Sequence, residues 1–269
     1  MKHLIKEWSR IKKDLKGKDI YLFLDFDGTL TRIRKRPGAV RLGREVKGIL
    51  KDIAKENVPL AIISGRSLEE IKRLVGVKGI IYAGNHGLEV EGPKHEFVVP
   101  EASRAKKTVA KIGKQLKQEL SSFRGVLIED KGLTLSVHFR MAKKEKLGQI
   151  EQAYKRMISP YISAGKIVVT SGKKVWEVRP PVRWDKGKAA SLLLKKRRQK
   201  SEKRIVSFYI GDDRTDEDAF RLLRKKAYTV KVGRKEGERT LAGYYLENTQ
   251  EVKKFLKIFL ALKREEKDV

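Results

Sequence analysis

Two carboxylates one residue apart, Asp25 and Asp27, are the residues of this sequence best suited to chemistry. They follow the apolar run Ile20–Leu24, which is typical of a buried strand in a parallel sheet. Ligands of open α/β sheets bind at the carboxyl edge, where such a loop lies. Two close carboxylates repel each other, so we expect a cation or a shared proton there. Gly28 permits a sharp turn, and Thr29 offers a hydroxyl and an N–H to an anion. An ordinary strand and turn is the alternative.

Polar residues also follow other predicted elements of the chain. Ser64 comes after the predicted strand 58–63, and a Gly-Asn-His-Gly segment, 84–87, follows the strand 79–83. Asp212 and its neighbour Asp213 follow the strand 205–210, and Lys186 precedes a predicted helix. These units have the period of βαβ repeats, so parallel packing should bring their ends to one edge.

The residue types at this edge indicate phosphoryl chemistry. The carboxylates can hold a hard cation, and Mg²⁺ suits two or three carboxylates with water and phosphate. Asp25 could attack phosphorus, while Asp27 could protonate the leaving oxygen and then activate water. Ser64, Thr29 and Lys186 could hold the phosphate. We choose Lys186 over Lys188 because it lies nearer the loop.

The middle of the chain has a different rhythm. Helices over 102–121 and 143–158, with strands over 126–129, 133–140, 166–170 and 174–179, predict an antiparallel sheet with helices on one face. The polar face of the sheet would be open to a ligand. We therefore predict an α/β protein with a Rossmann-like core and an inserted α+β cap. The core comprises 19–95 and 181–269, the cap comprises 96–180, and an amphipathic helix within 1–18 packs on the core.

Composition limits the partners and the compartment. The 269 residues contain no cysteine, which excludes disulfides and thiolate metal sites. Without a signal segment or an apolar run of membrane-spanning length, we expect a soluble cytoplasmic protein with no membrane partner. The net charge of +30 would suit nucleic acid, but the lysines are spread along predicted helix faces. The basic run 195–200 lacks interleaved aromatic residues, so we favour a solvated helix end.

The ordered motifs resemble those of the haloacid dehalogenase-like phosphatases. They are the Asp-Phe-Asp-Gly-Thr run 25–29, then Ser64, Lys186 and the Gly-Asp-Asp run 211–213. The resemblance implies Mg²⁺ as cofactor and an aspartyl-phosphate intermediate. We assign the metal to Asp25, Asp27 and Asp212.

Longer motifs resemble the trehalose-6-phosphate phosphatase family. They are Ser-Gly-Arg at 64–66, the 84–87 segment, 172–180 and 211–218. The resemblance implies a sugar-phosphate substrate and a functional link to a trehalose-6-phosphate synthase. It also implies substrate-binding residues, which in this sequence are Thr29, Arg66, Asn85, His86, Glu129, Lys131, Arg140, Lys173 and Glu177.

Several alternatives stay open from the sequence alone. The substrate could be another sugar phosphate, such as mannosyl-3-phosphoglycerate or sucrose phosphate. A basic nucleic-acid-binding protein is a third hypothesis, although clustered carboxylates would repel a phosphate backbone. Glu129 with Lys131 could be a surface pair, and His86 and His138 could be structural histidines.

Overall fold

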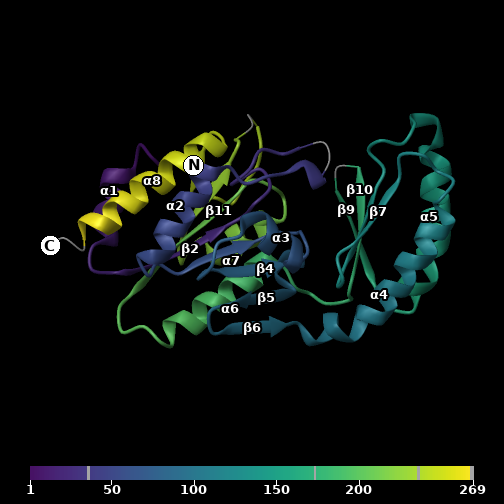
Figure 1. The fold of residues 1–269 in the computed structure, drawn as a ribbon, viewed down its shortest axis with the longest axis horizontal. Coiled ribbons are helices and arrows are strands. Elements are labelled where there is room, and N and C mark those ends of the chain that lie inside the picture. Colours follow the sequence, from purple (N-terminus) through teal and green to yellow (C-terminus); the bar gives the residue numbers. More distant parts are fainter. Residues whose placement is uncertain (35–36, 173, 235–236, 267–269) are drawn as a thin grey trace. The chain divides into compact units, whose positions relative to one another are not determined.

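The structure, a computed structural model, describes residues 1–34, 37–172, 174–234 and 237–266 (Figure 1). The chain divides into two compact units, 1–97 with 184–269, and 98–183. The sequence places the core at 19–95 with 181–269 and the cap at 96–180, and this domain assignment stays a prediction. The predicted α/β class is confirmed. No helix among the described residues is both long and apolar enough to span a membrane.

The first unit is built on one large sheet, whose strands in chain order are β1 (Lys2–His3), β2 (Asp19–Leu24), β3 (Leu60–Ile63), β4 (Ile81–Gly84), β5 (Glu89–Gly92), β6 (His95–Val98), β11 (Ile205–Gly211), β12 (Ala227–Val232) and β13 (Tyr244–Leu246). Within the described ranges the sheet order is β1-β13-β12-β11-β2-β3-β4-β5-β6. In this sheet order, each strand from β1 through β13, β12, β11, β2 and β3 to β4 pairs in parallel with the next one. β5 then runs antiparallel to β4.

Helices cover both faces of this sheet. They are α1 (Trp8–Leu15), α2 (Arg44–Lys55), α3 (Leu68–Val75), α6 (Lys186–Arg198), α7 (Asp216–Leu223) and α8 (Thr249–Glu265). Alternate residues of β2 explain the two layers, because Leu22 packs in a cluster with α1, α2, α3 and α8, whereas Phe23 packs with α6 and α7. Both faces of β2 are therefore buried, which accounts for its continuous apolar run.

The N-terminal helix is shorter than expected. The sequence predicts an amphipathic helix within 1–18, with its apolar spacing beginning at Leu4, but α1 begins only at Trp8. Lys2 and His3 instead pair with β13 and extend the sheet edge. Leu4 still reaches the core with no exposed area, because the turn before α1 directs it inward.

The second unit has a four-stranded antiparallel sheet and two long helices. In chain order these are α4 (Pro100–Glu119), β7 (Leu127–Asp130), β8 (Leu135–His138), α5 (Leu147–Ser163), β9 (Val168–Gly172) and β10 (Val175–Arg179). In the part that the structure describes, the sheet order is β7-β8-β10-β9. Apolar residues of both helices pack with Leu135, Val137 and Val178 in one core. The sheet face is less open than expected, since Thr134 and Ser136 are buried.

Candidate active site

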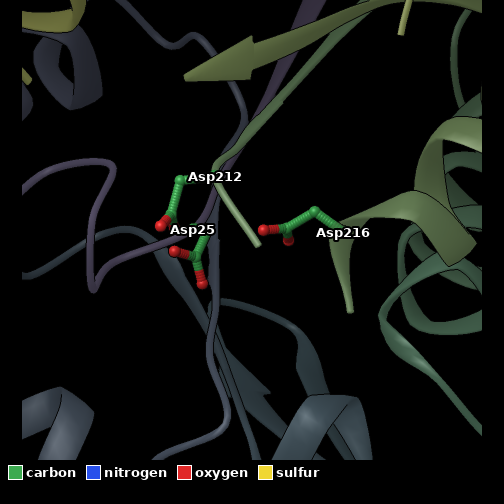
Figure 2. A group of neighbouring side chains, drawn as sticks. All are labelled: Asp25, Asp212 and Asp216. Atoms are coloured by element: carbon green, nitrogen blue, oxygen red, sulfur yellow. The ribbon is translucent and has the colours of Figure 1, made fainter. Parts of the chain in front are cut away.

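Three carboxylates gather at the carboxyl edge of the large sheet. Asp25 follows β2 and Asp212 follows β11, and β2 and β11 are parallel neighbours. The Asp25 N–H donates to the Ile210 carbonyl at 2.9 Å, which fixes the two strand ends together. Asp216 comes from the first turn of α7. Oxygens of the three side chains lie within 4.8 Å of one another, and Figure 2 shows their carboxylates turned together.

Lys186 places a cation in this group. Its Nζ donates to Asp25 at 2.8 Å and to Asp216 at 2.9 Å, and its side chain is only 2% exposed. Lys186 is the first residue of α6, which begins there because Asp185 accepts the Lys188 N–H at 2.8 Å as the N-cap. Lys186, the residue preferred over Lys188, therefore has its ammonium group against Asp25.

Asp216 was missed as a site residue. Besides Lys186, it accepts hydrogen bonds from the Tyr209 hydroxyl at 2.9 Å and the Asp213 N–H at 3.1 Å. These contacts orient the carboxylate that holds Lys186. The sequence signal was present, because Asp216 stands four residues after Asp212 in the same acidic motif.

Burial disfavours the ionised forms of the carboxylates at this site. Burial raises the pKa of Asp25 and Asp216 well above the usual carboxyl range, despite Lys186. Burial, together with Asp216 and Asp213, raises the pKa of Asp212 to about 7. For Lys186 burial alone would lower the pKa, but the surrounding carboxylates raise it well above its ordinary value. One ammonium group therefore remains charged among several carboxylates.

The donor set fits a hard divalent cation. Asp212 Oδ1 is buried and has no hydrogen-bond partner in the described part of the chain. Burying such an oxygen without a partner is costly, and a cation would satisfy it. Carboxylate oxygens are also the ligands that Mg²⁺ prefers. The residues present therefore suit a metal site at Asp25 and Asp212.

Asp27 lies in a different arrangement from the one expected. Its carboxylate accepts two hydrogen bonds from Arg66, from Nε at 2.6 Å and from Nη2 at 2.8 Å. Arg66 Nη1 also donates to Glu70 at 2.6 Å. The three-carboxylate group contains Asp216 and not Asp27. That Asp27 ligates the metal stays a prediction.

The loop after β2 depends on a glycine. Gly28 has φ +87°, and a Cβ there would lie 2.0 Å from Asp212 Oδ2. Only glycine allows the loop to approach Asp212 this closely. The Thr29 side chain is fully buried, and its hydroxyl has no hydrogen-bond partner among the residues described. Thr29 thus retains a hydroxyl available to a ligand.

The ends of β3 and β4 are tied to each other. Ser64 is 1% exposed, and its Oγ accepts the Arg66 N–H at 3.2 Å. The His86 N–H donates to the Ser64 carbonyl at 2.9 Å, and the Asn85 N–H donates to the Arg66 carbonyl at 2.7 Å. The Asn85 side chain donates to Glu89 at 2.6 Å. Ser64, Arg66, Asn85 and His86 therefore form one linked edge.

Lys231 is a second buried lysine that sequence reasoning missed. It is 3% exposed on β12, and its Nζ donates to the Asp212 carbonyl oxygen at 2.6 Å. Its Nζ also lies 3.1 Å from a Glu238 carboxylate oxygen. A lysine flanked by apolar residues in a predicted strand was the available signal. Lys231 fixes the backbone of the loop that carries Asp212.

The second unit holds the expected sugar-reading residues. Glu129, Ser136 and Glu177 are cross-strand partners in one row of the sheet, so their side chains share a face. Lys131 Nζ donates to Glu177 at 3.3 Å, and the side chains are 10% and 12% exposed.

Three more residues concern the expected sugar site: His138, which contacts Glu129, and the predicted residues Arg140 and Lys173. Glu129 pairs with His138 at 2.8 Å, which gives that histidine a structural partner. Arg140 is exposed just after β8, and Lys173 lies outside the described residues.

The chain is similar to known proteins over most of its length. Residues 23–250 match the family described as trehalose-phosphatase. Trehalose-phosphate phosphatase B of Arabidopsis thaliana is 36% identical over 260 residues, covering 93% of this chain and 68% of that protein. Trehalose 6-phosphate phosphatase RA3 of Zea mays is 33% identical over 256 residues, covering 90% and 70%.

Solved structures agree on the fold. A trehalose-6-phosphate phosphatase related protein superposes with a TM-score of 0.79 at 24% identity, covering 92% of this chain and all of that one. Aspergillus fumigatus trehalose-6-phosphate phosphatase superposes with a TM-score of 0.61 at 26% identity, covering 96% and 97%. The fold is that of the haloacid dehalogenase-like phosphatases. The chain belongs to the trehalose-phosphatase family and is a phosphoric monoester hydrolase.

Proposed function

We propose that this enzyme hydrolyses trehalose 6-phosphate to trehalose and phosphate. The observation that carries the proposal is the buried contact of 2.8 Å between Lys186 and Asp25, within a carboxylate group at the carboxyl edge. The substrate assignment rests on membership of the family and on the relatives named above.

The first step is attack on phosphorus by a carboxylate oxygen of Asp25. As the Asp25–phosphorus bond forms, the bond from phosphorus to the sugar oxygen breaks, and Asp27 gives that oxygen a proton. In the second step water attacks phosphorus and gives a proton back to Asp27. Phosphate leaves and Asp25 is restored as a carboxylate.

Other residues position these groups. The paired Arg66 hydrogen bonds hold the Asp27 carboxylate in one orientation, and Arg66 is itself held by Glu70. We assign the binding of the phosphate oxygens to Lys186, Ser64 and Thr29. Lys186 also stabilises the charge that develops on these oxygens.

Magnesium is the cofactor that we propose for the site. Asp25 and Asp212 would hold it, with Asp27 as the third ligand predicted from the sequence. When bound, the ion neutralises phosphate charge and orients the phosphoryl group for in-line attack.

Sugar recognition is assigned to the second unit. The ammonium and carboxylate groups of Lys131, Glu129 and Glu177 are suited to hydrogen-bonding sugar hydroxyls. Arg140 and Lys173 complete the set implied by the family resemblance. The substrate would come from a glycosyl transfer that makes the phosphorylated disaccharide, which is the proposed link to a synthase.

A panel of sugar phosphates tests this function. Phosphate release should be fastest with trehalose 6-phosphate in Mg²⁺, and should stop in EDTA. Sucrose phosphate, mannosyl-3-phosphoglycerate and glucose 6-phosphate serve as comparison substrates, each assayed separately at the same sub-saturating concentration. Faster turnover of any of these would reassign the substrate, and unchanged turnover in EDTA would remove the metal from the proposal.

A further inference from the structure

A basic hollow lies at the amino ends of β11 and β12. Its volume is about 570 Å³, and its lining includes Ile205 and Ala227, the first residues of those strands. Half of the lining residues are cationic, and they are Arg198, Lys203, Arg204, Arg224, Lys225 and Lys226. We propose that this hollow binds a compact anion carrying several phosphoryl charges.

The cations converge from three separate segments. Arg198 ends α6, Lys203 and Arg204 precede β11, and Arg224 to Lys226 form the turn after α7. A solvated helix end would account for Arg198 alone. The meeting of three segments at one hollow instead surrounds a single place with positive charge.

Arg204 alone of the six attracts the one lining carboxylate, Asp14, and lowers its pKa. Within the described ranges none of the six forms a salt bridge, whereas the neighbouring Arg197 pairs with Asp19 at 3.2 Å. Asp14 is the acidic residue of the lining, and hydrogen bonds from Lys18 and Tyr228 lower its pKa. Six like charges with one engaged carboxylate repel one another, and a bound anion would relieve that repulsion.

The lining favours a compact anion over nucleic acid. Single-strand binders offer free aromatic faces to successive bases. The two tyrosines here pack against each other at 5.4 Å, and Tyr228 also stacks on Phe208 at 4.9 Å. The Tyr228 hydroxyl bonds to Asp14, and the Tyr244 hydroxyl bonds to Arg10. The charges therefore enclose a hollow and do not line a stacking track.

The hollow is separate from the catalytic edge. Asp212 follows the carboxyl end of β11, whereas Ile205 begins the strand, and seven residues of strand span roughly 20 Å. An anion bound in the hollow would therefore occupy a site distinct from that of the substrate.

Calorimetry with tripolyphosphate tests the proposal. Titrations are made without divalent cations, in about 0.1 M salt, where exposed charges beyond roughly 10 Å are screened. The variant with Lys203→Gln, Lys225→Gln and Lys226→Gln should bind at least about tenfold more weakly than wild type. The control carries Lys106→Gln, Lys107→Gln and Lys111→Gln on α4, and loses the same three charges from exposed positions without salt bridges. It should bind like wild type.

Three results would overturn the proposal: no binding by wild type, equal weakening in both triple variants, or an oligonucleotide that binds more tightly than tripolyphosphate through the same lysines. Equal weakening would show that overall charge alone attracts the anion. Thermal melts confirm folding of each variant, and the double variant Arg198→Gln with Arg224→Gln provides an independent second test of the hollow.

Discussion

At the scale of single residues, the main feature of the site is the contact of the Lys186 ammonium group with two buried carboxylates. Without it, Asp25 and Asp216 would be buried together with no cation, which burial and mutual repulsion disfavour. The same contact favours the ionised form of Asp25, the proposed nucleophile, against the effect of burial, and it directs the ammonium group to the place where phosphate oxygens would gain charge. Lys186 therefore serves both folding and the proposed reaction.

Replacing this lysine gives the first prediction. Lys186→Met should lower kcat by roughly a hundredfold to a thousandfold, the usual loss for one charge-stabilising donor. Lys188→Met, two residues further along α6, should change kcat little. Initial rates of phosphate release measure both, with thermal melts to confirm folding. Equal losses in the two variants would contradict the assignment of Lys186.

The pH dependence of metal binding gives the second prediction. Burial, with Asp216 and Asp213 nearby, raises the pKa of Asp212 to about 7, so the group is mainly protonated at pH 6 and ionised at pH 8. Protons and Mg²⁺ compete for the same oxygens, so affinity should rise with pH, by up to about tenfold over this range.

The sign for stability is the opposite. The folded-state pKa of Asp212 lies above the unfolded value of about 3.9, so its contribution to stability is present below that value. It is lost as pH rises through about 7, and the metal-free protein should then melt at lower temperature.

Calorimetric titration of Mg²⁺ at pH 6 and pH 8 tests the predicted rise in metal affinity. A wild-type affinity as flat with pH as that of Asp212→Asn would refute it.

Strand ends predicted where the candidate site lies, because parallel strands bring Asp25, Ser64 and Asp212 to one edge whatever the details of packing. Side-chain partners could not be read in this way. Asp216 and Lys231 bond the backbone of the loop after β11, and these contacts form only on folding. Arg66 binds the Asp27 carboxylate, which is not part of the three-carboxylate group. Such choices depend on distances of a few ångströms, which sequence spacing does not specify.

At the scale of elements, the apolar patterns predicted most strands and helices but not their ends. β1 has only two residues and no apolar pattern, so it was not expected from the sequence. The helix expected to stop at residue 158 continues through Pro160 to Ser163. Pro160 has no N–H to donate to the preceding turn, but its carbonyl still accepts the Ala164 N–H at 3.1 Å, so the last turn closes beyond the proline.

The row of polar residues on the second unit's sheet gives the third prediction. Glu177→Gln should cut kcat/KM for trehalose 6-phosphate by roughly tenfold to a thousandfold, about 1.4–4 kcal/mol of transition-state binding. Turnover of p-nitrophenyl phosphate, which has no sugar, should change little. Glu145→Gln, an exposed glutamate of the same unit, is the matched control.

Comparing the losses of kcat/KM for the two substrates decides the role of this row of polar residues. Lys131 and Glu177 contact each other, so a change at either could act through folding alone. Equal losses with both substrates would show such a structural role and would remove the basis for sugar recognition by these residues.

At the scale of the whole molecule, the net charge of +30 gives the fourth prediction. Nucleic acid should bind weakly and without sequence preference, and binding should disappear as salt rises because counterions are released. Fluorescence anisotropy with two unrelated oligonucleotides, at low and physiological salt, measures this. Tight, sequence-selective binding at physiological salt would instead support the nucleic-acid hypothesis.

The basic hollow and the candidate active site are separate features of the molecule. The carboxylates lie at one end of the parallel strands, and the basic hollow lies at the other. The catalytic centre is therefore acidic within a strongly basic protein. The net charge alone would suit nucleic acid, whereas the motifs indicate phosphoryl transfer.

The most direct measurement is mass spectrometry of the acid-quenched enzyme during turnover of trehalose 6-phosphate with Mg²⁺. An aspartyl-phosphate mechanism predicts that the peptide containing Asp25 gains the mass of one phosphoryl group. Asp25→Asn should show no such peptide and should release trehalose at a rate reduced by at least about a thousandfold, because an amide is a poor nucleophile. A folded Asp25→Asn enzyme that turns over within a few-fold of wild type would contradict the proposed mechanism.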